Sequence, residues 1–311
     1  MDTTIQYSVV IPVYRGAQTL ELLTRRLVAV LDSLQKPYEI LFIDDGSPDN
    51  SWDIIKKTKN SYPHIRAMRL MRNFGQHNAL MCGFNHARGA YIITMDDDLQ
   101  HPPEEIPKLI DAISDRYDIV YGVYAGKKHN FLRNLGSRFI IWSYHKALGV
   151  RGDITSFRII RREIIQNVIA YDKSFTFIDG FLAWHTRNIG YVKIQHDERA
   201  TGRSGYSLGK MLNLSFNLFT NFSLKPLQLA SVVGIIFALI GFLLGIYYLG
   251  RRILVGTDFP GFSAIFVAVS IFSGIQLIIL GLIGEYLGRI HMNISKKPQY
   301  AVREDLGDNA D

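Results

Sequence analysis

A short segment from Tyr91 to Glu105 carries the strongest structural signal in the chain, and it reads Tyr-Ile-Ile-Thr-Met-Asp-Asp-Asp-Leu-Gln-His-Pro-Pro-Glu-Glu. Its first five residues are apolar or β-branched, which predicts a buried strand. Three aspartates follow, and the proline pair then predicts the start of a helix with two glutamates in its first turn, where anions suit the helix dipole. Because open α/β sheets bind ligands beyond the carboxyl ends of their strands, the aspartates mark a candidate site.

The three aspartates also predict a metal site. Residues two apart on an extended chain share a face, so we expect Asp96 and Asp98 to point one way and Asp97 the other. Two carboxylates ~4 Å apart repel by roughly 1–4 kcal/mol. A divalent cation reverses the sign, and Mg²⁺ or Mn²⁺ suits such hard oxygen ligands, to which Gln100 can add a carbonyl oxygen. The alternative is a solvated acidic turn, which the flanking strand and helix disfavour.

Whole-chain totals restrict the class of protein. The 311 residues suffice for one large or two moderate domains, and the formal net charge of +7 fits either nucleic acid or an anionic lipid surface. The single cysteine, Cys82, excludes an internal disulfide and fits a reducing compartment. The N-terminus runs straight into a predicted strand, so we expect no secretory signal.

Strands and helices alternate along the first part of the chain, which predicts a parallel sheet with helices on both faces. Apolar runs predict strands at residues 8–14, 38–43, 65–70 and 118–122. Helices are predicted at 19–34 and 51–59, and a third follows residues 73–78 and ends at about residue 86. Neither G-x-G-x-x-G after the first strand nor G-x-x-x-x-G-K-S/T is present, so neither a dinucleotide-binding fold nor a P-loop is supported.

A second acidic pair, Asp44 and Asp45, closes the second predicted strand and falls on the same edge of the sheet as Asp96. A carboxylate there can accept a hydrogen bond from a base N–H or a ribose hydroxyl. The alternative for each residue is an aspartate that caps its own turn.

Three motifs, taken together, resemble family-2 glycosyltransferases of the GT-A fold. They are Ile11-Pro-Val-Tyr14, Asp44-Asp-Gly-Ser47 and Asp96-x-Asp98-Leu-Gln-His-Pro-Pro-Glu. Their order and spacing are similar to those of the polyprenyl-phosphate sugar transferases, which include dolichol-phosphate mannose synthase and the undecaprenyl-phosphate glucosyl- and aminoarabinosyl-transferases. The resemblance implies a nucleotide-sugar donor beside Pro12, Tyr14, Asp44, Asp45 and Asp97, and a metal at Asp96, Asp98 and Gln100. Relatives often carry Asn-Glu after the tyrosine, where this chain has Arg15-Gly16.

Residues 118–207 add candidates on the acceptor side. A predicted helix at 131–148 places Arg133 and Ser137 on one face, a suitable pair for a phosphate, although an arginine on a solvated face is the alternative. The resemblance assigns the lipid phosphate to these two positions, and Lys127 or Lys128 replaces an arginine that some relatives carry. It also assigns Asp153, of Asp153-Ile-Thr-Ser156, to catalysis on the acceptor side, and Arg199 and Arg203 to the donor pyrophosphate. The two arginines fit lipid headgroups equally well.

The C-terminal part predicts a membrane anchor. Residues 208–222 suit a helix lying along a membrane surface. Residues 227–249 and 263–283 are uncharged and long enough to cross a bilayer core of about 30 Å. Positive-inside counting puts the catalytic domain and both termini in the cytoplasm, while Arg251 and Arg252 count the other way. The predicted domains are 1–207, 208–226, 227–290 and 291–311, and the resemblance at Gly284-Glu-Tyr-Leu-Gly-Arg-Ile290 implies a homotetramer.

No convincing general base is visible, and the implied chemistry needs none. A phosphate monoester has its second pKa near ~6, so it is largely dianionic at neutral pH and can attack an anomeric carbon directly. We therefore predict an inverting glycosyltransferase of the inner membrane that moves one hexose, with UDP-glucose favoured by resemblance, to undecaprenyl phosphate; no nucleic acid is involved. One alternative is a processive polysaccharide synthase, disfavoured by the missing Gln-x-x-Arg-Trp sequence. The other is an inactive scaffold, disfavoured by the intact Asp96-x-Asp98.

Overall fold

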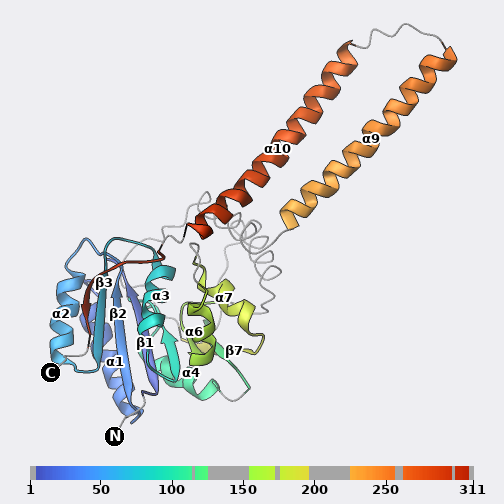
Figure 1. Cartoon of the computed structure of the whole chain (residues 1–311). Coiled ribbons are helices and arrows are strands. Elements are labelled where there is room, and N and C mark those ends of the chain that lie inside the picture. The colour runs from blue at the N-terminus through green and yellow to red at the C-terminus, as the bar shows by residue number, and fades with distance from the viewer. Residues whose placement is uncertain are drawn as a thin grey trace. The chain divides into compact units, whose positions relative to one another are not determined.

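Figure 1 shows the protein as a computed structural model, which describes residues 5–113, 116–124, 154–171, 176–195, 225–255, 262–295 and 298–307. The chain divides into two units, one formed by residues 1–205 with 296–311 and the other by residues 206–295. The first unit contains a mixed sheet and the second a pair of long helices.

Within the described residues, the first unit has an eight-stranded sheet in the order β7-β5-β6-β4-β1-β2-β3-β8. β1 runs parallel to β2 and β4, β2 is parallel to β3, and β5 is parallel to β7, whereas β6 and β8 are antiparallel to their neighbours. The predicted, mostly parallel α/β sheet is therefore confirmed. The strands are Tyr7–Val13 (β1), Tyr38–Asp44 (β2), Ile65–Leu70 (β3), Tyr91–Thr94 (β4), Ile119–Tyr124 (β5), Arg158–Arg161 (β6), Ile189–Ile194 (β7) and Val302–Leu306 (β8).

Helices cover both faces of this sheet, as the alternation predicts (Figure 1). Val9, Ile11 and Val13 of β1 share the main core with α1, whose Leu20, Leu23, Leu27 and Leu31 are fully or almost fully buried at helical spacing. Val10 points to the other face, where a Cβ on Gly83 of α3 would come within 2.2 Å of its Cγ1. The helices of this unit are Leu20–Ser33 (α1), Ser51–Ser61 (α2), Gln76–His86 (α3), Ile106–Ala112 (α4, after a 3₁₀ turn at Pro103–Glu105), Arg162–Ile169 (α6) and Ile178–His185 (α7).

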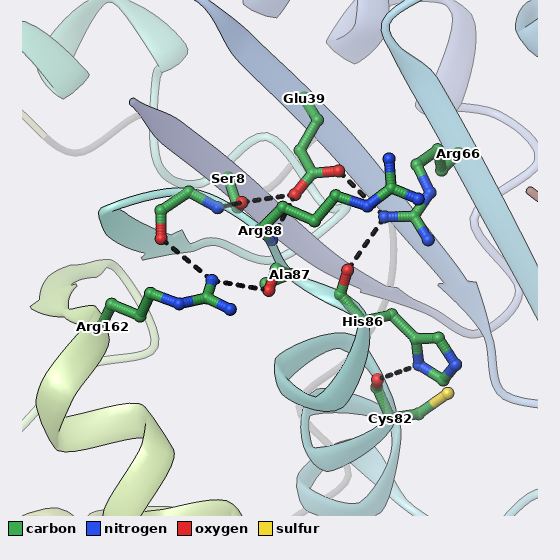
Figure 2. A network of polar contacts seen from close by, with 9 residues as sticks. Ser8, Glu39, Arg66, Cys82, His86, Ala87, Arg88 and Arg162 are labelled. Carbon is green, nitrogen blue, oxygen red and sulfur yellow. Dashed lines mark hydrogen bonds and ion pairs between the residues drawn. The ribbon is translucent and has the colours of Figure 1, made fainter. Parts of the chain in front are cut away.

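A buried polar network joins the strands at their amino ends, away from the aspartates (Figure 2). Glu39 of β2 pairs with Arg66 of β3 at 3.0 Å and accepts hydrogen bonds from the Ser8 hydroxyl and the Arg88 N–H, both at 2.6 Å. Arg66 also donates to the His86 carbonyl at 2.9 Å. Because each charge has several partners, the cost of burying this ion pair is offset, and the network links β1, β2 and β3.

The C-terminal segment, predicted only as a tail at 291–311, contributes a strand to the sheet. β8 pairs antiparallel with β3, and Glu304 accepts a hydrogen bond from the Trp52 indole at 2.9 Å. Sequence reasoning missed it because three of its five residues are charged, as suits the edge of a sheet.

The second unit consists, among its described residues, of α9 (Lys225–Val255) and α10 (Phe262–Ile294). Each contains a window long and apolar enough to cross a membrane, Ala230–Tyr247 with a mean hydropathy of 2.4 and Ile271–Ile294 with 1.7, and neither window is buried. The expectation of two candidate membrane helices is confirmed. The predicted surface helix at 208–222 lies outside the described residues.

Candidate functional site

A cleft of about 290 Å³ lies at the carboxyl ends of the central strands. Because β1, β2 and β4 are parallel, their final residues meet at one edge of the sheet, where such folds bind ligands. A larger cavity of about 600 Å³ lies at the amino ends of β2 and β3, the opposite edge. The 290 Å³ cleft is lined by Pro12, Val13, Tyr14, Asp45, Asn73, Gly75, Gln76, Asp96, Asp97 and Asp98, so six residues predicted from the sequence come together there.

The acidic turn differs from the predicted alternation of faces. β4 ends at Thr94, and the backbone then turns, with Leu99 in the left-handed region at φ 62°. All three aspartates line the same cleft, so the expectation that Asp97 points away from Asp96 and Asp98 is wrong. Instead, the Tyr14 N–H donates to Asp97 Oδ2 at 3.4 Å. The period-two rule fails here because it applies to extended backbone only.

Asp96 is held from two sides. Gln76 Nε2 donates to Asp96 Oδ1 at 2.6 Å, and the Ser156 hydroxyl donates to Oδ2 at 2.6 Å. Sequence reasoning did not single out Gln76, although it stands in the polar run Asn73-Phe-Gly-Gln-His-Asn78 before α3, on the same edge of the sheet. The two bonds fix the direction in which the Asp96 carboxylate faces the cleft.

Negative charge is crowded at this turn. Burial, together with the charges of Asp96 and Asp98, raises the pKa of Asp97 to about 7, and the Tyr14 N–H opposes the shift. Removing a carboxylate from water disfavours its charged form, and like charges add to the effect. A cation in the cleft would relieve this repulsion.

The carboxylate oxygens in the cleft suit a cation whose remaining coordination positions are filled by a bound substrate. Asp96 and Asp98 provide hard oxygen atoms in the cleft, while the Gln100 backbone N–H donates to Asp98 Oδ1 at 3.1 Å. In the part of the chain that the structure describes, no three His, Cys, Asp or Glu side chains are grouped to hold a metal ion by themselves. Mg²⁺ commonly binds one or two carboxylates together with phosphate oxygens of a substrate.

Asp45 lines the same cleft and holds a neighbouring loop in place. Its Oδ1 accepts the Phe74 N–H at 2.7 Å and its Oδ2 accepts the Gly75 N–H at 2.8 Å. Burial raises the pKa of Asp45, and these two N–H groups oppose the shift. Asp45 therefore holds the loop that carries Asn73 and Gly75 to the cleft.

Asp44, by contrast, is fully buried and is not among the residues that line the cleft. It pairs with Arg69 Nε at 3.2 Å and accepts the Ser47 N–H at 3.2 Å. Gly46 between them has φ 65°, and a Cβ there would lie 2.6 Å from the Arg72 carbonyl carbon, which only glycine avoids. The structure thus favours the turn-capping alternative for Asp44.

Seven predicted site residues lie outside the described ranges: Lys127, Lys128, Arg133, Ser137, Asp153, Arg199 and Arg203. Their assignments remain predictions. Ser156, the last residue of the predicted Asp153-Ile-Thr-Ser156 motif, is described and contacts Asp96.

Comparison with known proteins gives three findings. Residues 8–175 match the model of glycosyl transferase family 2. The undecaprenyl-phosphate 4-deoxy-4-formamido-L-arabinose transferases of Serratia proteamaculans and Yersinia enterocolitica are both 38% identical, covering 97% and 96% of this chain and 94% and 93% of their own. The crystal structure of glucosyl-3-phosphoglycerate synthase from Mycobacterium tuberculosis, with Mn²⁺, UDP and glucosyl-3-phosphoglycerate, has a TM-score of 0.51 at 15% identity and covers 70% of this chain and 78% of its own. This last likeness concerns the fold alone.

Proposed function

Since the chain belongs to glycosyl transferase family 2 and is a glycosyltransferase of the GT-A fold, we propose that it transfers one sugar from a nucleoside diphosphate donor to undecaprenyl phosphate. The observation that carries the proposal is the cleft at one edge of the sheet, where Asp45, Asp96 and Asp98 meet. Two helices of membrane-spanning length in the same chain suit a lipid acceptor. The printed names of the curated relatives support that acceptor.

On the donor side, we propose UDP as the nucleotide and Mg²⁺ or Mn²⁺ as the cofactor. Asp96 and Asp98 would hold the cation, with Gln100 beside them, and Arg199 and Arg203 would contact the pyrophosphate. A bound divalent cation neutralises charge that develops on the leaving diphosphate. The Mn²⁺ and UDP of the mycobacterial structure support this choice.

On the acceptor side, Arg133 and Ser137, with Lys127 or Lys128, would bind the lipid phosphate, and Asp153 would lie near it. A phosphate oxygen attacks the anomeric carbon as the bond from that carbon to the donor diphosphate breaks, so the sugar configuration inverts. Because the phosphate is already largely dianionic at neutral pH, its attack releases no proton that a base must take. The protein mainly positions the two reactants in line.

The sugar is the point at which the relatives differ from the sequence-based preference for UDP-glucose. Both curated relatives are named for 4-deoxy-4-formamido-L-arabinose, a modified pentose, and not for a hexose. We propose this sugar class as the first to test and glucose as the second. We also propose that the protein is anchored in the inner membrane with its catalytic domain in the cytoplasm. In the same proposal it assembles as a homotetramer.

A donor panel tests the proposal. Purified protein in lipid nanodiscs is mixed with undecaprenyl phosphate, Mg²⁺ and one labelled nucleotide sugar at a time, including UDP-4-deoxy-4-formamido-L-arabinose and UDP-glucose. We expect label to enter the organic phase with one donor only. Label in a water-soluble polymer would instead indicate a processive synthase, and no transfer from any donor would indicate a scaffold.

A further inference from the structure

The Asp97 carboxylate occupies the space in which a side chain at position 16 would begin. A Cβ atom built on Gly16 would lie 2.3 Å from Asp97 Oδ2 and 3.2 Å from its Cγ. Gly16 is not among the residues with positive φ, so alanine suits its backbone. We therefore attribute the glycine to the lack of room for a side chain beside the Asp97 carboxylate, and not to a special backbone conformation.

The same carboxylate oxygen contacts the loop that follows β1. The Tyr14 N–H donates to Asp97 Oδ2, while the Arg15 N–H donates to the Ser47 hydroxyl at 3.1 Å. The Gly16 carbonyl accepts the Thr19 N–H at 3.0 Å, which joins the loop to the start of α1. Arg15 has φ 60°, a conformation that costs energy in a non-glycine residue and persists only when its surroundings hold it.

This loop forms one wall of the cleft, because Pro12, Val13 and Tyr14 line it. We propose that Asp97 is a positioning residue: its carboxylate, packed against Gly16, braces residues 14–16 so that this wall is formed before the donor binds. Glycine at position 16 admits that brace. The effect on donor binding rests on the proposed function, whereas the steric coupling between the two residues does not.

The proposal gives Asp97 a role different from that of Asp96 and Asp98. A brace makes its contribution before chemistry begins, so its loss weakens donor binding more than turnover. A direct ligand of the reacting groups would lower kcat instead.

The first test is a double-mutant cycle read by thermal unfolding. Gly16→Ala places a methyl group 2.3 Å from Asp97 Oδ2, whereas Asp97→Ala removes this closest atom and Cγ and leaves Val13 Cγ1 at 3.2 Å, where a small side-chain shift suffices. We expect Gly16→Ala to lower Tm in the wild-type background and to have little effect in the Asp97→Ala background. An equal loss of Tm in both backgrounds would overturn the coupling.

The second test measures UDP affinity calorimetrically in Mg²⁺, together with KM and kcat for the donor that the panel identifies. We expect Gly16→Ala and Asp97→Ala each to raise Kd and KM by about tenfold, equivalent to roughly 1.4 kcal/mol, with kcat within about twofold. The double variant should be no worse than the worse single variant. Independent effects that multiply, or a kcat loss larger than the KM change, would refute the positioning role.

Gly190→Ala is a matched control. Gly190 lies on β7, outside the cleft, and a Cβ there would come within 2.9 Å of the Tyr117 ring. It should lower Tm while leaving the UDP affinity unchanged; weakened UDP binding here would show that general destabilisation explains the Gly16→Ala result. If UDP fails to bind the wild-type protein, the proposed function and the binding role of Asp97 both fail. The thermal cycle still decides whether the two residues are coupled.

Discussion

The surroundings of the Asp97 side chain disfavour its ionised form. Its neighbours in sequence are two further carboxylates, and its Oδ2 accepts a backbone N–H and lies beside a glycine. Spacing predicted that the aspartates gather at the sheet edge, because parallel strands end together. It could not predict the direction of Asp97, since that depends on the left-handed Leu99 and on a hydrogen bond from Tyr14, 83 residues earlier in the chain.

A pH prediction follows for this residue. The folded-state pKa of Asp97 is raised from 3.8 to about 7. Ionising it therefore costs stability: the cost is absent below about pH 4, grows as the pH rises towards 7 and is complete above it. We expect Asp97→Asn to raise Tm at pH 8 by more than at pH 5, measured in EDTA. A difference in Tm that does not change with pH would show that the carboxyl titrates normally.

Among the elements, β8 departs most from what the sequence predicts. Its pattern Val-Arg-Glu-Asp-Leu reads as a polar tail, and its partners, which include the edge of β3, the Trp52 indole and the core under Leu306, are distant in the sequence. Such tertiary pairing leaves almost no local trace. The buried strands β1 and β2, in contrast, are visible in the sequence because their apolar runs have no other stable environment.

Truncation tests the role of β8. Ending the chain after residue 297 should uncover the β3 edge, lower Tm and promote aggregation in size-exclusion chromatography. Ending it after residue 307 keeps β8 and serves as the control. If both truncations behave like the full chain, β8 contributes nothing to the sheet.

The Glu39–Arg66 pair allows a second test of sheet assembly. Arg66→Met removes the guanidinium that pairs with Glu39 and donates to His86, at a cost of about 3–5 kcal/mol. In a unit of this size Tm should fall by roughly 10 °C. Adding Glu39→Gln should recover part of the loss, because the buried charge is then gone. A Tm change below about 2 °C for Arg66→Met would contradict a structural role for the pair.

For the whole molecule, the alternation of strands and helices and the two long apolar segments were readable from the sequence. Both signals come from burial: the helices of the first unit repeat their buried residues at helical spacing, whereas the buried strands and the long helices of the second unit are continuous apolar runs. Hydrogen bonds such as that from Gln76 to Asp96 have no period. They become visible only when distant loops meet at one edge.

The reactivity of the single cysteine measures whether the first unit is folded. Cys82 is fully buried on α3, and burial raises the pKa of its thiol to about 12. A buried, protonated thiol is a poor nucleophile. We expect maleimide labelling to begin only where urea abolishes UDP binding, with free glutathione in the same solution labelled throughout. Rapid labelling of the folded protein would show that α3 opens under native conditions.

We propose above that Asp96 and Asp98 hold a divalent cation during transfer of a sugar to a polyprenyl phosphate. The most direct measurement is transfer of label into undecaprenyl phosphate by the wild-type protein, Asp98→Ala and the exposed-site control Asp53→Ala. EDTA should abolish wild-type transfer, and Mg²⁺ or Mn²⁺ should restore it. Asp98→Ala should lose at least about 100-fold in rate, while Asp53→Ala should match the wild type. Undiminished transfer by Asp98→Ala, or by the wild type in EDTA, would contradict the claim.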